Sequence, residues 1–468
     1  MITHSQIKLH CSQKFQGILF LAICLYAFVS YSQIENPNAH TFQPIYINNG
    51  VYRYTNQAHQ ATPLLPPNGV TADHIIQQNN QNTLSTIGYS TPKTPPSDPY
   101  LRDQYIRQNA QQETLNKQKH YLAEIYQILN ETLPEYQNSE EPQQSIKTKN
   151  YRDVFLEIQN MQNGNTLFSL KRAIFLIENA WYDNTLDYQI YCSQIDREAN
   201  FIKKIALESH IEANNDLGYN YIIQKLFSAP TQEYTNGKYQ SFSYDFDDFM
   251  GEQDWSKMFV SKLLNNGKGQ CHSLPLLYLI LAEETETKAW LAFAPEHSYI
   301  IFGDHSKHQY YNFETTNGNL VSNDWIMESG YISTPAIRNR IYLDTLGTDQ
   351  LISTLVADLA MGYTNKYGYD SFVNSMIDYL LQLNPKNIQG HILKADLQII
   401  QTKYHLKKVG NPPIQEIHLY PDANKSYTAL LKEYEIIDAL GYTPMPKEIY
   451  ESWLSSANAQ QQNAPHGK

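Results

Sequence analysis

The sequence predicts an α+β protein in which a buried helix lies against an antiparallel sheet, with helices before this core and an all-helical region after it. Three observations support this prediction. The segment 271–284 is apolar on nearly all sides, as in a helix buried in a core. Strand-length apolar segments follow at 288–294, 297–302 and 310–316, and after Asn339 the apolar residues fit only helices. A buried helix against an antiparallel sheet is an α+β arrangement.

The first 32 residues have the pattern of a signal peptide. Two lysines precede the apolar run 17–29, which is short for a membrane span, and small or polar residues follow it. We expect cleavage near Ser32 and export, so the mature protein would be periplasmic, secreted or at the cell surface. Lipidation at Cys24 is a weaker alternative because Ile23 precedes it, and an uncleaved anchor is another. We expect no membrane span after cleavage.

Residues 33–100 are rich in Asn, Gln, Pro and Thr and show no sustained apolar periodicity. We therefore expect a low-complexity, disordered leader. A helical segment is expected at 101–165, with a first helix that ends near Pro134 and a second that begins at Tyr151.

The region from 166 to 266 is expected to be mostly helical. Apolar spacing predicts helices at 166–181, 188–207, 219–226 and 255–264. The acidic run 243–249 lacks the ligand spacing of an EF-hand, so we expect a solvated loop there.

The region 341–468 contains several amphipathic helices. They are predicted at 351–361, 369–383, 388–404 and 427–440. The sequence Leu383-Asn384-Pro385 resembles the turn that closes a tetratricopeptide repeat, although one unit alone is clear. The alternatives are such a repeat region, with a protein partner on its helices, and an irregular helical extension of the core. The tail 455–468 is polar and is expected to fray.

Cys271 stands where the loop Gly267-Lys268-Gly269 turns into the buried helix. Backbone N–H groups at a helix start stabilise a thiolate and lower its pKa, and they can also hold an oxyanion. This position predicts a nucleophile.

A base and an orienting group follow on neighbouring strands. His297 begins one strand, and the next carries Asn312 and Glu314 on the same face, because side chains alternate along a strand. The polar segment 303–308 between them predicts a hairpin. Glu314 is the expected third member of a Cys-His-acid triad, and Asn312 is the alternative because an amide can also orient histidine.

Other polar residues near Cys271 have weaker claims. Gln270 could donate to an oxyanion, but an exposed loop amide is the favoured interpretation. His272 is a poor base because it points about 100° away from the thiol on a helix. His305 and His308 fall in the expected hairpin turn and should face solvent.

Signal cleavage would leave two of the four cysteines, Cys192 and Cys271. They either form a disulfide or are both reduced, and Cys192 is interpreted as a buried spacer on its helix. No CxxC or HExxH spacing supports a zinc site, so we expect neither a metal nor an organic cofactor.

Three segments carry a family resemblance: GKGQCHSLPLLYLILAEE, PEHSYIIF and YYNFETTNG. Together they resemble the transglutaminase-like superfamily of papain-like cysteine enzymes. The resemblance implies a papain-like core within 166–340 and a triad of Cys271, His297 and Glu314. The superfamily usually has Asp-Pro-Thr where this chain has Glu314-Thr315-Thr316. Its members include cross-linkers, peptidases, amidases and inactive relatives, so the substrate is not fixed.

The formal net charge of −12 argues against nucleic acid or an anionic membrane as a partner. Two functions remain. The first is an exported cysteine-dependent hydrolase or acyltransferase that acts on protein or peptide amides. The second is an inactive transglutaminase-like and helical-repeat module that binds a protein or glycan.

Overall fold

The computed structural model describes residues 45–48 and 51–52, scattered positions from 102 to 130, and 133–444 with short gaps. These gaps are 138–145, 229–231, 235–236, 240, 250, 252, 305–307 and 331. The predicted signal peptide, most of the predicted leader and the polar tail lie outside the described residues. The described positions from 102 to 129 are helical, as predicted.

The chain divides into two compact units. One unit is Ser30–Ile125, in which β1 (Ile45–Asn48) and β2 (Val51–Tyr52) form an antiparallel hairpin that the sequence did not predict. The other unit holds every element from Tyr126 onward. The predicted boundary at 340 and 341 lies inside this larger unit.

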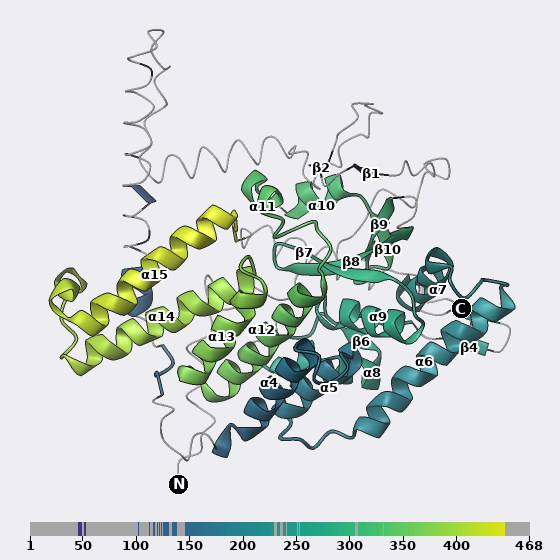
Figure 1. Cartoon of the computed structure of the whole chain (residues 1–468), viewed down its shortest axis with the longest axis horizontal. Coiled ribbons are helices and arrows are strands. Elements are labelled where there is room, and N and C mark those ends of the chain that lie inside the picture. Colours follow the sequence, from purple (N-terminus) through teal and green to yellow (C-terminus); the bar gives the residue numbers. More distant parts are fainter. Residues whose placement is uncertain are drawn as a thin grey trace. The chain divides into compact units, whose positions relative to one another are not determined.

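The larger unit begins with a group of long helices (Figure 1). They are α4 (Lys149–Gln162), α5 (Leu170–Trp181), α6 (Tyr188–Glu208) and α7 (Asp216–Ser228). Helix α5 begins four residues later than predicted, because Ser169 has an extended backbone and its hydroxyl accepts a hydrogen bond from the Arg172 N–H. Asp187 caps α6 in the same way.

Short elements connect α7 to the central helix. They are β3 (Gln232–Tyr234), β4 (Gly237–Tyr239), β5 (Ser243–Tyr244), the 3₁₀ helix η2 (Trp255–Met258), α8 (Val260–Asn266) and β6 (Lys268–Gly269). The single helix predicted at 255–264 is therefore two elements, because Phe259 has an extended backbone between them.

The acidic run 243–249 is not the solvated loop that the sequence predicted. Asp245 is buried and forms an ion pair with Lys262 of α8. Asp248 accepts hydrogen bonds from the backbone N–H groups of Gln253 and Asp254. These contacts tie the run to the segment that leads into α8.

The central layer consists of α9 (Ser273–Glu284) and an antiparallel sheet. The strands are β7 (Ala289–Ala294), β8 (His297–Asp304), β9 (Gln309–Glu314) and β10 (Asn319–Val321), paired in the order β7-β8-β9-β10. Every residue of α9 from Ser273 to Ala282 is buried. The predicted α+β class is confirmed.

The rest of the unit is helical. It comprises α10 (Asn323–Gly330), α11 (Thr334–Asn339), α12 (Thr348–Tyr367), α13 (Ser371–Leu383), α14 (Ile388–Lys408), the 3₁₀ helix η4 (Ile414–Leu419) and α15 (Pro421–Leu440). The sequence did not predict α10 and α11. From α12 to α15 each long helix packs against the next, and α12 also packs on α4 and α5.

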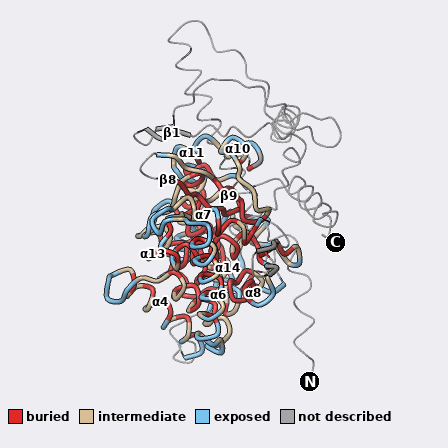
Figure 2. Tube along the Cα trace, turned by 90° about the vertical axis from the view of Figure 1, so that its right-hand side faces the viewer, coloured by how far each residue is buried: buried red, intermediate tan, exposed pale blue. Residues whose placement is uncertain are grey.

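Buried residues form a continuous band through this unit (Figure 2). The band includes the sheet, α9 and α12, so the last helices share a core with the first ones. No helix among the described residues combines the length and apolarity of a membrane span.

Candidate active site

Cys271 lies in the turn just before α9 and is completely buried. Its carbonyl oxygen accepts a hydrogen bond from the Ser298 hydroxyl, 2.5 Å away, which ties this turn to β8. The turn is tight: a Cβ atom on Gly269 would lie 2.6 Å from the Ser273 hydroxyl oxygen, which binds the Gln270 N–H. Glycine at position 269 therefore permits the close approach that places the thiol.

His297 begins β8, is buried, and binds Glu314 of β9. Nε2 of the imidazole forms a hydrogen-bonded ion pair with Oε2 of Glu314, and both side chains are about 2% exposed. Oε1 of Glu314 accepts hydrogen bonds from the Thr316 N–H at 3.1 Å and from its hydroxyl at 2.9 Å. Thr316 thus holds the carboxylate that orients the imidazole.

Sheet register explains why Glu314 and not Asn312 meets His297. One step beyond the pair Ile300–Phe313, Glu314 lies opposite Tyr299, which is two residues from His297 on the same face. Asn312 pairs with Ile301, which lies four residues, or ~13 Å, from His297 along β8. The Asn312 amide donates instead to Oδ1 of Asn323, 2.7 Å away.

Cys271 also interacts with the imidazole and, like Glu314, favours its charged form. Burial by itself would lower the pKa of His297, but the Glu314 carboxylate and Cys271 together raise that pKa to about 10. The raised pKa means that the imidazole is charged at neutral pH.

Gln270 differs from its prediction as an exposed loop amide. Its side chain is fully buried, and neither its amide nitrogen nor its amide oxygen has a hydrogen-bond partner among the described residues. A buried amide without partners costs about 1–3 kcal/mol. Its amide nitrogen is a hydrogen-bond donor, and Gln270 directly precedes Cys271 in the sequence. An oxyanion site requires such donors.

A second buried polar group begins at His272, the residue after Cys271. Burial lowers the pKa of His272 to about 4, so its imidazole is neutral, and Nε2 lies 3.5 Å from Oδ2 of Asp358 on α12. Glu178 of α5 accepts the N–H groups of Val260 and Ser261 at 2.6 and 2.9 Å, and burial raises its pKa to about 7. His272, Asp358 and Glu178 line a cavity of about 20 Å³, room for one water molecule.

Sequence reasoning missed Glu178 and Asp358. Each is a single carboxylate in an otherwise apolar stretch of helix, far from the Cys271 motif in sequence. An acidic residue on an apolar helix face is the one local signal for such a group, because a carboxylate is rarely buried unless it is paired or hydrogen-bonded.

An apolar cluster covers the thiol. Trp255, Met258 and Phe259 are buried together with Cys271, and partly buried residues of α12 and of the chain around the end of α5 pack against them. The sequence did not predict this cluster, because its residues come from segments that meet only in the folded chain. An apolar surrounding strengthens charge interactions within it.

The remaining predicted residues lie elsewhere. Cys192, predicted as a buried spacer, is half-buried, and neither Cys192 nor Cys271 is in a disulfide. His308 is exposed, as expected, whereas His305 lies outside the described residues. Among the described residues, no group of three or more His, Cys, Asp and Glu side chains could hold a metal ion.

Comparisons with known proteins do not assign a family. No protein-family model matches the chain, and none of the curated proteins matches it. Among solved structures, a crystal structure of menin, which reveals its binding site for the Mixed Lineage Leukemia (MLL) protein, aligns with 66% of this chain and 88% of its own. The TM-score is 0.27 and the sequence identity 13%, too low to establish a shared fold.

Proposed function

We propose that the protein is an exported cysteine-dependent hydrolase or acyltransferase that acts on amide bonds of proteins or peptides. The observation that carries the proposal is the buried His297–Glu314 ion pair, whose imidazole also interacts with Cys271. Acyl transfer needs a nucleophile, a base near it and a carboxylate that orients the base.

The chemistry follows from this chain. The Cys271 thiolate attacks the amide carbonyl, and the new S–C bond places a negative charge on the carbonyl oxygen. The His297 imidazolium gives its Nδ1 proton to the leaving amine as the C–N bond breaks, which leaves a thioester and a neutral imidazole. His297 then takes a proton from the incoming water or amine, whose attack on the thioester breaks the S–C bond and restores the Cys271 thiolate beside the imidazolium.

The neighbouring groups have supporting roles. Glu314 stabilises the imidazolium and fixes the ring, and Thr316 fixes Glu314. The unpartnered Gln270 amide is the proposed donor to the oxyanion. A glutamate in place of the aspartate usual in the transglutaminase-like superfamily still reaches Nε2, so this difference does not remove the proposed papain-like site.

The second candidate function is an inactive binding module with a transglutaminase-like core and repeat-like C-terminal helices. One observation favours it: Cys271 is completely buried in an apolar cluster with Trp255 and Phe259. An enzyme must move this cover to admit a substrate, whereas a binding module need not.

The two functions differ in how Cys271 reacts with iodoacetamide. We would alkylate the folded full-length chain from about pH 5 to 9 and quantify each cysteine by peptide mass spectrometry. An enzyme site predicts that Cys271 reacts well below the pH range of an ordinary thiol, and that His297→Ala abolishes this. Cys192, measured in the same sample, is the matched control. The enzyme proposal is contradicted if the alkylation profile of Cys271 matches that of Cys192 and is unchanged by His297→Ala. It is also contradicted if Cys271 never reacts.

A further inference from the structure

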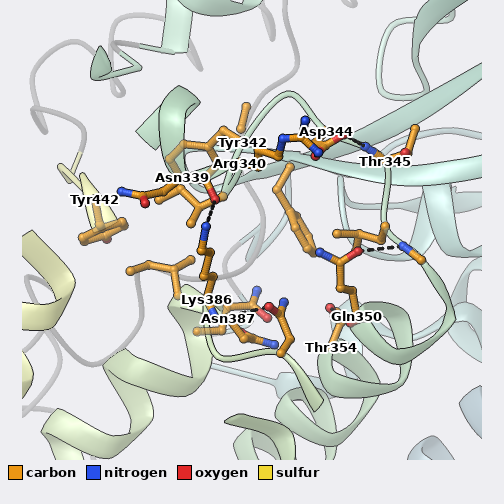
Figure 3. Close-up of a pocket in the computed structure, with 18 of the residues that line it drawn as sticks. Asn339, Arg340, Tyr342, Asp344, Thr345, Gln350, Thr354, Lys386, Asn387 and Tyr442 are labelled. Atoms are coloured by element: carbon orange, nitrogen blue, oxygen red, sulfur yellow. Dashed lines mark hydrogen bonds and ion pairs between the residues drawn. The ribbon is translucent and has the colours of Figure 1, made fainter. Parts of the chain in front are cut away.

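Cys271 is completely buried, so its thiol can meet a substrate only if part of the chain moves. A cavity of about 430 Å³ lies between the sheet and the C-terminal helices, but neither Cys271 nor His297 lines it (Figure 3). The cavity beside His272, of about 20 Å³, has room for one water molecule. The proposed function therefore requires that a neighbouring segment opens a path to the thiol.

The segment 253–258, which we call the lid, has one buried and one exposed side. Its Trp255 and Met258 are buried in the apolar cluster with Cys271, whereas its first two residues are exposed. The lid contains η2, a 3₁₀ helix of four residues, whose hydrogen-bond geometry is poorer than that of an α-helix. The partly buried residues that pack on the cluster lie on or near α5 and α12, two long helices that pack against each other. Moving the lid therefore disrupts less structure than moving either helix.

Phe259 is the joint between the lid and α8. Its backbone is extended, with φ −86° and ψ 144°, and separates η2 from α8. Its ring packs edge-on against Trp181 and Tyr182, at centroid distances of 6.2 and 5.9 Å. Glu178 of α5 accepts the first two N–H groups of α8, at 2.6 and 2.9 Å. These contacts hold Phe259 and α8 in place, so a rotation at this joint moves the lid alone.

Two carboxylates that precede the lid hold it closed. Asp247 forms an ion pair with Lys257 of the lid, 2.6 Å away, and Asp248 accepts the Asp254 N–H at 2.7 Å. The side chains of Asp247 and Lys257 are 78% and 27% exposed, and an ion pair in contact with water contributes little to stability. The chain before them is fixed, because Asp245 is buried and ion-paired with α8. The closed lid is therefore held from outside by contacts that break easily.

We propose that the lid opens by rotation at Phe259 and thereby admits the substrate to Cys271. The inference rests on the proposed function, because a binding module does not need access to its thiol. With the lid closed, Trp255 and Met258 keep water and substrate away from the thiol. With the lid open, the Asp247–Lys257 pair is broken, while α5, α8 and α12 keep their places.

The rate at which iodoacetamide alkylates Cys271 in the full-length chain measures lid opening, because the reagent reaches the thiol only when the lid is open. Lys257→Met removes the ion pair with Asp247 and should raise this rate about twofold to fivefold. Trp255→Phe leaves a gap in the packing of the lid and should raise the rate about tenfold. Lys425→Met, which changes an exposed lysine on α15, is the matched control and should leave the rate unchanged.

Leu397→Ala separates lid opening from unfolding of the whole chain. Leu397 is buried in α14, so this variant lowers the global stability without altering the lid. If iodoacetamide enters through the lid, the alkylation rate of Cys271 should not change. Entry through global unfolding would instead raise the rate more than tenfold. Urea unfolding and circular dichroism show that each variant is folded under the conditions of the assay.

Two results would overturn the lid. One is an unchanged alkylation rate of Cys271 in both Lys257→Met and Trp255→Phe. The other is an acceleration in Leu397→Ala that equals that in Trp255→Phe. Failure of the proposed function is distinguishable, because it concerns the pH profile of alkylation and its response to His297→Ala. The lid variants should change the rate by the same factor at every pH and leave the midpoint of the profile where it is.

Discussion

Glu314 and Asn312 share one face of β9, yet the imidazole binds Glu314, and this difference can be measured at a single residue. Glu314→Gln removes the charge that most strongly raises the pKa of His297. We expect the pH profile of Cys271 alkylation to move upward by about 1–3 pH units, because a less stable imidazolium stabilises the thiolate less.

Asn312→Ala is the control for this change, because it alters the same strand face without touching the imidazole. Its alkylation profile should match that of the unaltered chain. Equal shifts in both variants would mean that the strand and not the carboxylate sets the reactivity, and the triad would lose its third member.

His297 also links stability to pH. Its pKa is raised from 6.5 to about 10, so its contribution to stability is complete below pH 6.5 and is lost as the pH rises through about 10. The difference in unfolding free energy between the unaltered chain and His297→Gln should therefore shrink over this range. Urea unfolding at several pH values measures it, with exposed His418→Gln as the control. A difference that is constant with pH would argue that the buried imidazole is neutral.

At the scale of elements, the turn after β9 holds the triad carboxylate in place. The Gly318 N–H donates to the Glu314 carbonyl oxygen at 2.8 Å, with φ at +71°. A Cβ atom there would lie 2.3 Å from Cα of Ser228 at the end of α7. Gly318→Ala should lower the unfolding free energy by about 2–4 kcal/mol, from backbone strain plus overpacking.

Gly164→Ala separates these two contributions. Gly164 has a similar φ of +74°, but no atom lies within 4 Å of its ideal Cβ. Gly164→Ala should lower the unfolding free energy through backbone strain alone, by about 1 kcal/mol, as measured by denaturant unfolding. If both alanine variants lose the same stability, the contact between the turn and α7 does not hold the site.

Elements were predictable where the pattern is local. The apolar run of α9 and the alternation in β8 and β9 placed Cys271, His297 and Glu314 on neighbouring elements, and the strand face narrowed the third member to two residues. The choice between them needed the register, which depends on long-range pairing. The break at Phe259, the burial of Gln270 and the approach of Asp358 to His272 also arise from tertiary contacts that no periodicity reports.

At the scale of the molecule, the C-terminal helices and the site share one core. Asp358 of α12 reaches His272 beside the nucleophile, and Lys366 near the end of α12 binds the Trp181 carbonyl and the Asp183 carboxylate at 2.7 and 2.6 Å. Packing of α12 on α4 and α5 joins the two halves across the boundary at 340 and 341. Such contacts favour a single cooperative unfolding transition.

A core substitution in α14 tests this cooperativity. The chain has five tryptophans, and all but Trp453 precede α12, so with Trp453→Phe as background their fluorescence reports the first half. Leu397 is 1% exposed, and Leu397→Ala should remove about 2–5 kcal/mol. In urea, the fluorescence and circular dichroism midpoints should fall together, as for the control Ile195→Ala in α6. A fluorescence midpoint that stays unchanged in Leu397→Ala would show that the C-terminal helices unfold as a separate domain, because a shared core transmits the lost stability to every probe.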